Sequence, residues 1–426
     1  MKNSFYLALS MVLSATVLSA CDTTSTTRWE SPAYSERKVA PPAEFPEIPQ
    51  KQFEHADGQT RGEGLKFDPR VDILFVIDNS ASMAPHQANL RRNINKFVNS
   101  IARTKVIDFH IGVTTIYDSV RYGSIVQKTC GGKINYLDNG ELTPLQGLAT
   151  PITERFVSRK QGFVNVLEQT LNVGVSPFLN SSTGCSTGPE EEESFSPIIA
   201  SFGEKNQTTS NIGFWREGSL KVIMIVSDAF DASKELTPSL VYENLYQLSG
   251  STPNDQKFRI YAVAPIPGQS VNQKTGMIDG SKTCQLDFGY KENGAFPSRV
   301  PDHNVAQLVE MAGGRLLSIC SSNYGVELAK VGEEIRVATL KDIVYDLPKI
   351  PDRSPQRNIR VWFHRDAKVS QQLVENEHWY YDAQENRVVI HGMKLDWDEY
   401  PDAYISVDYF VYDATDPHNQ IIKGSQ

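Results

Sequence analysis

The sequence predicts an α/β protein with a doubly wound, mainly parallel sheet and a small C-terminal antiparallel β-domain. Between residues 66 and 340, short apolar runs alternate with amphipathic stretches, an order typical of parallel sheets covered by helices. From residue 341 onward, strand-like runs follow one another with only turn residues between them. A length of 426 residues with 40% hydrophobic residues suits two or three compact units and excludes a coiled coil or a wholly disordered chain.

The apolar runs set the order of the α/β elements. The run 71–77 is rich in β-branched and aromatic residues and short enough to be a buried strand. Over 85–102, apolar residues recur at helical spacing and predict an amphipathic helix. The same criteria predict strands over 109–113, 220–226, 258–264 and 315–319, and helices over 163–171, 190–202, 238–248, 304–312 and 326–339.

Two segments, 118–159 and 268–299, are long for connections and rich in glycine and polar residues, so we expect surface insertions there. The acidic run 190–193 follows Pro189, and we interpret it as a helix start that favours the helix dipole and needs no partner.

The C-terminal region 341–426 begins with a proline-rich segment, 347–351, that we interpret as a hinge. Four runs with strand character follow, and the last alternates polar and apolar residues, as in a sheet with one buried face. We expect a β-sandwich or partial barrel with an aromatic core, in which the histidines are surface or cross-strand residues. The runs are 359–363, 379–381, 387–390 and 404–412, and the histidines are His364, His378 and His391.

The N-terminal segment is typical of an export signal. A short basic start precedes an apolar stretch over 5–18, too short to span a bilayer, and no acidic residue occurs before Asp22. Leu18-Ser19-Ala20-Cys21 resembles the lipobox of bacterial lipoproteins, which implies that residues 1–20 are removed and that Cys21 carries acyl chains such as palmitate. The alternative is an ordinary cleaved signal followed by an incidental cysteine.

Residues 21–65 are rich in Thr, Ser, Glu and Pro, and we expect a tether between the lipid and the folded part. The expected location is the bacterial cell envelope, on a membrane whose identity the sequence leaves open.

Four further cysteines, Cys130, Cys185, Cys284 and Cys320, have no C-x-x-C spacing and no neighbouring histidine. In an exported protein this pattern predicts two disulfides rather than a zinc site. Three pairings are open, and we favour Cys130 with Cys185 and Cys284 with Cys320.

Several classes of protein are disfavoured. A net charge of −9 without a basic stripe argues against nucleic acid, and the motifs of nucleotide-binding proteins and zinc proteases are missing from the sequence. Residues 184–188 match G-x-S-x-G, and Asp228 and His303 follow Ser186 in the order of a hydrolase triad. The residues before this motif are polar, whereas a nucleophile elbow needs an apolar strand there. We expect a protein that is not an enzyme and keep an α/β hydrolase using Ser186 as a third alternative.

Oxygen-bearing side chains follow two of the predicted strands. Asp78, Ser80 and Ser82 come after the first strand, and Asp228 comes after the strand 220–226. The carboxyl ends of parallel strands meet at one edge of the sheet, so we expect these residues to lie together. Oxygen ligands without histidine or thiolate suit Mg²⁺ first, then Mn²⁺ or Ca²⁺. The simpler alternative is that the two serines cap the first helix.

These residues resemble the metal-ion-dependent adhesion site (MIDAS) of von Willebrand factor type A (VWA) domains, over residues 66–340. The resemblance implies that Ser80 and Ser82 bind the ion directly, and that Asp78, Asp228 and Thr183 bind it directly or through water, with Thr187 as an alternative to Thr183.

An ion held this way keeps one position for water, which an acidic side chain of another protein can displace. The expected function is adhesion or assembly of an envelope complex through a protein partner. A metal-independent envelope scaffold that uses the C-terminal β-module is the alternative.

Overall fold

The computed structural model describes residues 65–66, 69–116, 139–150, 152–160, 162–175, 192–233, 235–253, 255–279, 284, 286, 293–321, 324–355, 357–365, 369–395, 399–400 and 403–412. The expectations for the signal, for the tether before residue 65 and for Cys21, Cys130, Thr183, Cys185, Ser186 and Thr187 fall outside these residues. Within them, no helix has the length and apolar character needed to cross a membrane.

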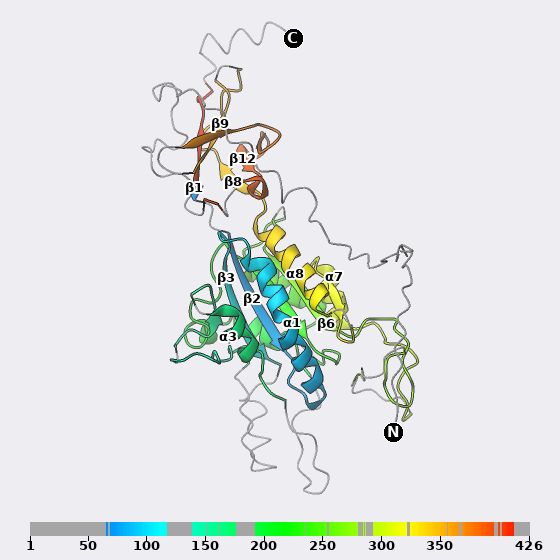
Figure 1. The fold of residues 1–426 in the computed structure, drawn as a ribbon. Helices are drawn as coiled ribbons and strands as arrows, with labels where there is room; N and C mark the ends of the chain where they lie inside the picture. Colours follow the sequence, from blue (N-terminus) through cyan, green and yellow to red (C-terminus); the bar gives the residue numbers. More distant parts are fainter. Residues whose placement is uncertain are drawn as a thin grey trace, which may run out of the picture. The chain divides into compact units, whose positions relative to one another are not determined.

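A six-stranded sheet in the order β4-β3-β2-β5-β6-β7 forms the centre of the α/β part (Figure 1). Every neighbouring pair is parallel except β3 with the short edge strand β4. The expected doubly wound, mainly parallel sheet is therefore confirmed. The strands are β2 (Arg70–Ile77), β3 (Asp108–Thr115), β4 (Phe156–Val157), β5 (Leu220–Val226), β6 (Phe258–Ala264) and β7 (Leu316–Ser318).

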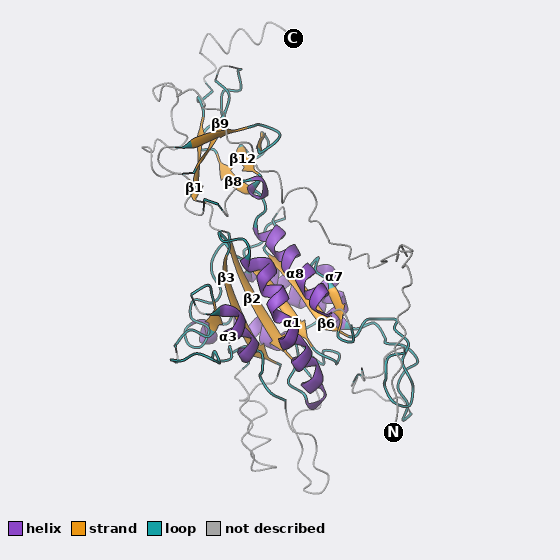
Figure 2. Cartoon of the chain, in the orientation of Figure 1, coloured by secondary structure: helices purple, strands orange, loops and turns teal. Residues whose placement is uncertain are grey.

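Helices cover both faces of this sheet (Figure 2). One apolar cluster joins one face to α1, α3 and α8, and a second cluster joins the other face to α4, α6 and α7. The helices are α1 (Ala84–Ala102), which follows the short η2 (Ala81–Met83), then α3 (Phe163–Thr170), α4 (Phe195–Ser201), α5 (Glu204–Gln207), α6 (Pro238–Leu248), α7 (Asn304–Met311) and α8 (Tyr324–Thr339).

Strand β2 shows why the apolar pattern produces this arrangement. Successive side chains of a strand point to opposite faces, so Phe75 enters the α1 side while Leu74 and Val76 enter the other. On the α1 side, Phe75 meets Phe97 edge to face, with ring centroids 5.6 Å apart. Helix α8 then lies against α1, and a Cβ atom at Gly332 would be 2.6 Å from the carbonyl oxygen of Phe97. The close approach of these helices therefore requires glycine at position 332.

Three expectations about connections are corrected. The helix expected over 190–202 begins only at Phe195, so Glu192 and Glu193 precede it rather than forming its first turn. The described part of segment 118–159 is not merely a surface insertion, because Leu142 is fully buried and β4 pairs with β3. This segment covers the outer edge of β3, which would otherwise be exposed. Segment 268–299 likewise contributes Val271, Ile278, Leu286 and Phe296 to the apolar cluster on the α1 side.

The C-terminal β-domain consists of two antiparallel sheets that share one apolar core, and it confirms the expected small antiparallel domain. The core contains the aromatic residues Phe363, Trp379 and Tyr409. Segment 347–351 follows strand β8, and Leu347 is buried in this core. His364 is a cross-strand residue, bonded to Ser370 and Ser406. One sheet has the order β1 (Leu65–Lys66), β13 (Tyr404–Asp408), β9 (Arg360–His364) and β10 (Ser370–Leu373), and the other β11 (Trp379–Asp382), β12 (Arg387–Ile390) and β8 (Ile343–Asp346).

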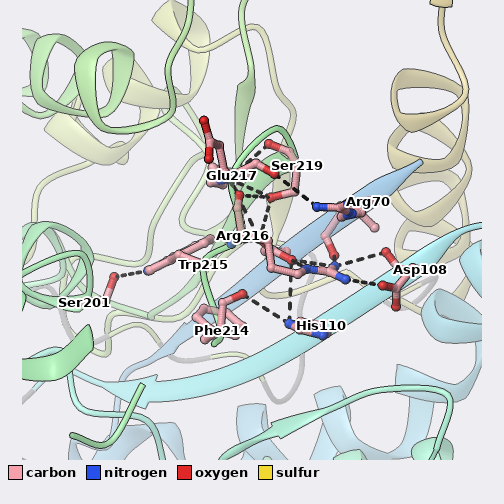
Figure 3. Close-up of polar contacts among 12 residues, drawn as sticks. Arg70, Asp108, His110, Ser201, Phe214, Trp215, Arg216, Glu217 and Ser219 are labelled. Carbon is pink, nitrogen blue, oxygen red and sulfur yellow. Dashed lines mark hydrogen bonds and ion pairs between the residues drawn. The ribbon is translucent and has the colours of Figure 1, made fainter. Parts of the chain in front are cut away.

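A largely buried ionic network lies at the edge of the α/β sheet where β2, β3 and β5 begin (Figure 3). Arg216 donates through its backbone N–H and its Nε to the fully buried carboxylate of Asp72, at 2.7 and 2.8 Å. Its guanidinium also pairs with Asp108, and Ser219 donates to Asp72. Burial lowers the pKa of nearby Lys221, whose ammonium group donates to Ser219 Oγ at 2.7 Å. The network fixes the chain that leads into β5.

Candidate metal centre

The loops after β2 and β5 are joined at the carboxyl edge of the sheet. The N–H of Asp78 donates to the carbonyl of Val226 at 2.9 Å, which extends the parallel pairing beyond β2. The Asp78 side chain is fully buried, with Oδ1 accepting from Ser80 N–H and Oδ2 from Ser227 Oγ, both at 2.7 Å. Asp78 therefore connects the two loops that carry the other oxygen ligands.

The two serines and Asp228 form a continuous chain of contacts. Ser80 Oγ lies 3.1 Å from Ser82 Oγ, and Ser82 Oγ donates to Asp228 Oδ1 at 3.1 Å. Ser80 precedes η2 but makes no side-chain cap hydrogen bond, and the residue that precedes α1 is Met83. Neither hydroxyl therefore caps the first helix, contrary to the simpler interpretation of these serines. The structure brings together four of the residues expected from the sequence, and the threonine loop lies outside the described residues.

Sequence reasoning missed a third carboxylate. One carboxylate oxygen from each of Asp78, Glu192 and Asp228 lies within 4.8 Å of the other two. Asp78 and Asp228 are buried and Glu192 is half-buried. The acidic run that we interpreted as a helix start therefore delivers Glu192 to the same edge of the sheet.

Contacts with the loop after β5 hold Glu192 in place. Its carbonyl accepts from Ala232 N–H at 2.7 Å. The Asp231 carboxylate accepts from the N–H groups of Ser194 and Phe195, at the start of α4. Burial raises the pKa of Asp231 to about 6, against the opposing effect of these hydrogen bonds. The sequence signal for Glu192 was the acidic run itself, but its position depends on contacts with a loop about forty residues away in the chain.

His86 and Gln87, at the start of α1, border the cluster. His86 Nε2 lies 3.9 Å from Asp228 Oδ2, and burial lowers the pKa of His86 although a hydrogen bond with the backbone of Ile319 opposes this shift. A neutral imidazole leaves the negative charge of the cluster uncompensated. Gln87 Nε2 donates to the carbonyls of Asp78 and Gly174, both at 3.0 Å, and so ties the end of the α3 segment to the loop after β2.

The donor set fits a hard divalent cation. Its ligand atoms are carboxylate and hydroxyl oxygens, which suit Mg²⁺, Mn²⁺ and Ca²⁺ rather than a soft metal. When all three carboxylates are ionised they repel one another, and a divalent ion would offset this repulsion.

His303, the remaining expected member of a hydrolase triad, caps a helix. Its Nδ1 accepts from Ala306 N–H at 3.2 Å at the start of α7, and its Nε2 lies 2.6 Å from the carbonyl oxygen of Pro265. Both ring nitrogens are therefore engaged with the backbone.

The expected disulfide between Cys284 and Cys320 is present. It connects segment 268–299 to the loop after β7.

Comparisons with known proteins give structural similarities only. A scan against protein-family models found no match, and neither did a search of curated proteins. Among solved structures, the chain is similar to proximal thread matrix protein 1 from the mussel byssus, at 11% identity and a TM-score of 0.30, over 66% of this chain and 50% of that protein. A structure of the same byssal protein with a zinc-occupied MIDAS motif has 10% identity and a TM-score of 0.26, with coverage of 67% and 52%. BatB from Bacteroides thetaiotaomicron has 11% identity and a TM-score of 0.29, with coverage of 62% and 98%. At this level of similarity, the functional argument depends on the geometry of the site.

Proposed function

We propose that this chain is a lipid-anchored protein of the bacterial envelope that binds another protein through a divalent cation at a MIDAS-like site and has no catalytic activity. The observation that carries the proposal is the convergence of Asp78, Ser80, Ser82 and Asp228 at one edge of a parallel sheet. Buried carboxylates that face each other are costly unless a cation or a proton offsets their charge. A bound Mg²⁺, with Mn²⁺ or Ca²⁺ as alternatives, would provide that offset.

The arrangement suits adhesion because of the ligands it supplies. Mg²⁺ takes six oxygen ligands and keeps waters readily, so a position facing solvent can accept a carboxylate from a partner. The serine hydroxyls are neutral, so these two ligands add no negative charge at the ion. We propose Glu192 as an additional group near the ion, since its carboxylate lies with those of Asp78 and Asp228.

Calorimetric titration of the full chain with Mg²⁺ and Mn²⁺ tests the cation site. We expect saturable binding in the wild type and its loss in Asp228→Asn, while the control Asp279→Asn, at an exposed position, binds as the wild type does. No heat of binding with either ion would refute the cation site.

Capture of envelope proteins on the immobilised chain, with Mg²⁺ and then with EDTA, tests the role. Partners that remain bound both in EDTA and to Asp228→Asn would favour the metal-independent scaffold. Labelling with radioactive palmitate, lost in Cys21→Ala, tests the lipid anchor.

A further inference from the structure

A polar pocket of about 610 Å³ lies between α1, α3 and the loop before β4. Small-molecule pockets are mostly lined by apolar and aromatic side chains. Here Val173 is the apolar member of the described lining, and the rest is polar, with one positive and one negative charge. The other lining residues are Arg91, Thr143, Gln146, Asn165, Glu168, Gln169 and Asn172.

Several of these polar groups are available to a ligand. The Thr143 hydroxyl is buried and has no hydrogen-bond partner among the described residues. Arg91 donates its Nε to the carbonyl of Glu168 at 3.1 Å, which leaves its two terminal nitrogens for other acceptors. Gln146 and Asn172 are exposed, and Gln146 Nε2 donates to the carbonyl of Pro144 at 3.2 Å. An amide side chain carries donors and an acceptor, as a peptide group does, and one donor of Gln146 is already engaged with Pro144.

The pocket is adjacent to the candidate metal centre. Gln87 joins the carbonyl of Asp78 to that of Gly174, which follows the pocket residues of the α3 segment. Arg91 is four residues after Gln87 on α1, which is about 6 Å along the helix.

We propose that this pocket binds the main chain of the partner protein beside the acidic residue that reaches the cation. The inference rests on the proposed function and specifies its ligand. The ligand is a peptide segment that contains an Asp or Glu for the cation. The peptide groups of the residues beside this acidic residue bond to Arg91 and to the amide side chains of Gln146 and Asn172. The lining contains one guanidinium and one carboxylate and offers both donors and acceptors. This mixture suits the uncharged peptide groups of a backbone better than a ligand with a net charge.

Selection of short random peptides displayed on phage, on the full chain immobilised in detergent with Mn²⁺, tests the proposal. We expect the selected peptides to share an Asp or Glu and to be released by EDTA and by Asp228→Asn. Arg91→Ala should weaken their binding by about tenfold to a hundredfold while the affinity for Mn²⁺ stays unchanged. The matched control is Arg92→Ala, the next and more exposed arginine of α1.

Asn172→Ala provides a second variant, because this side chain is exposed and its loss should not disturb folding. Wild-type peptide affinity in both Arg91→Ala and Asn172→Ala would overturn the pocket while leaving the cation-dependent function intact. Peptides that remain bound in EDTA and to Asp228→Asn would refute the proposed function together with this extension of it. A selection that yields no peptide, or a glycan array in which a sugar is bound and is lost in Arg91→Ala, would also overturn the proposal.

Discussion

Replacement of Glu192 by glutamine tests the role of the third carboxylate in the candidate metal centre. The change keeps the shape of the side chain and removes one charge. The carboxylate oxygens lie within 4.8 Å of one another, and at this upper limit, with an effective dielectric constant of about 20, two like charges repel by about 3.5 kcal/mol. Because Glu192 is half-buried, solvent screening reduces this value, and we expect a net effect of about 2 kcal/mol.

Removal of this charge should have opposite effects on the cation-free and the cation-bound protein. Without a cation, Glu192→Gln relieves repulsion and should raise the free energy of unfolding. With a cation, it removes an attraction, so the dissociation constant for Mg²⁺ should rise by about thirtyfold. Chemical unfolding in EDTA and calorimetric titration with Mg²⁺ measure these two quantities.

The control for this experiment is Glu243→Gln, at an exposed position of α6, which should change neither quantity. If Glu192→Gln leaves Mg²⁺ affinity at the wild-type value, Glu192 lies near the ion without contributing to its binding. If the variant is less stable than the wild type in EDTA, the inferred repulsion is wrong.

Three further predictions concern stability. Gly332→Ala should lower the free energy of unfolding by about 1–3 kcal/mol, because the clash of the new methyl group with the backbone of Phe97 outweighs the gain in helix propensity. Urea unfolding measures this loss, and an unchanged midpoint would contradict the close contact between α1 and α8. Asp72→Ala should cost about 3–5 kcal/mol because it removes the fully buried carboxylate to which Arg216 and Ser219 donate, whereas a cost under about 1 kcal/mol would show that solvent reaches the network. The third prediction concerns Asp231, whose folded-state pKa of about 6 exceeds the ordinary 3.8, so the folded protein binds this proton more tightly than the unfolded chain does. The stability of the wild type relative to Asp231→Asn should therefore fall by up to about 3 kcal/mol as the pH rises from about 4 to 6, and a pH-independent difference between the two unfolding curves would refute the assignment.

The regular elements of the α/β part could be predicted because their signals are local. The apolar run of β5 has the bounds that its composition indicates, and α6 begins after a threonine cap with a proline in its first turn. Asp78 and Asp228 could be expected together, because the ends of parallel strands share an edge.

The elements that were missed depend on contacts between distant residues. Strand β10 reads Ser-Gln-Gln-Leu and has no strand signal, but pairing with β9 makes it a strand. Strand β4 is two residues long and is specified by β3. The position of Glu192 requires Ala232 and the capping carboxylate of Asp231, neither of which is visible from the acidic run alone.

The parallel placement of β2 has a mechanical consequence. Strand β2 lies between β3 and β5 and is parallel to both. Asp78 directly follows its C-terminal end, and the chain enters its N-terminal end at Arg70, after β1. A force applied between the N-terminal side of the chain and a partner held at Asp78 would load β2 along its own axis. The hydrogen bonds from β2 to both neighbouring strands would then be loaded in shear and would bear the force together. The sheet would therefore not open one hydrogen bond at a time.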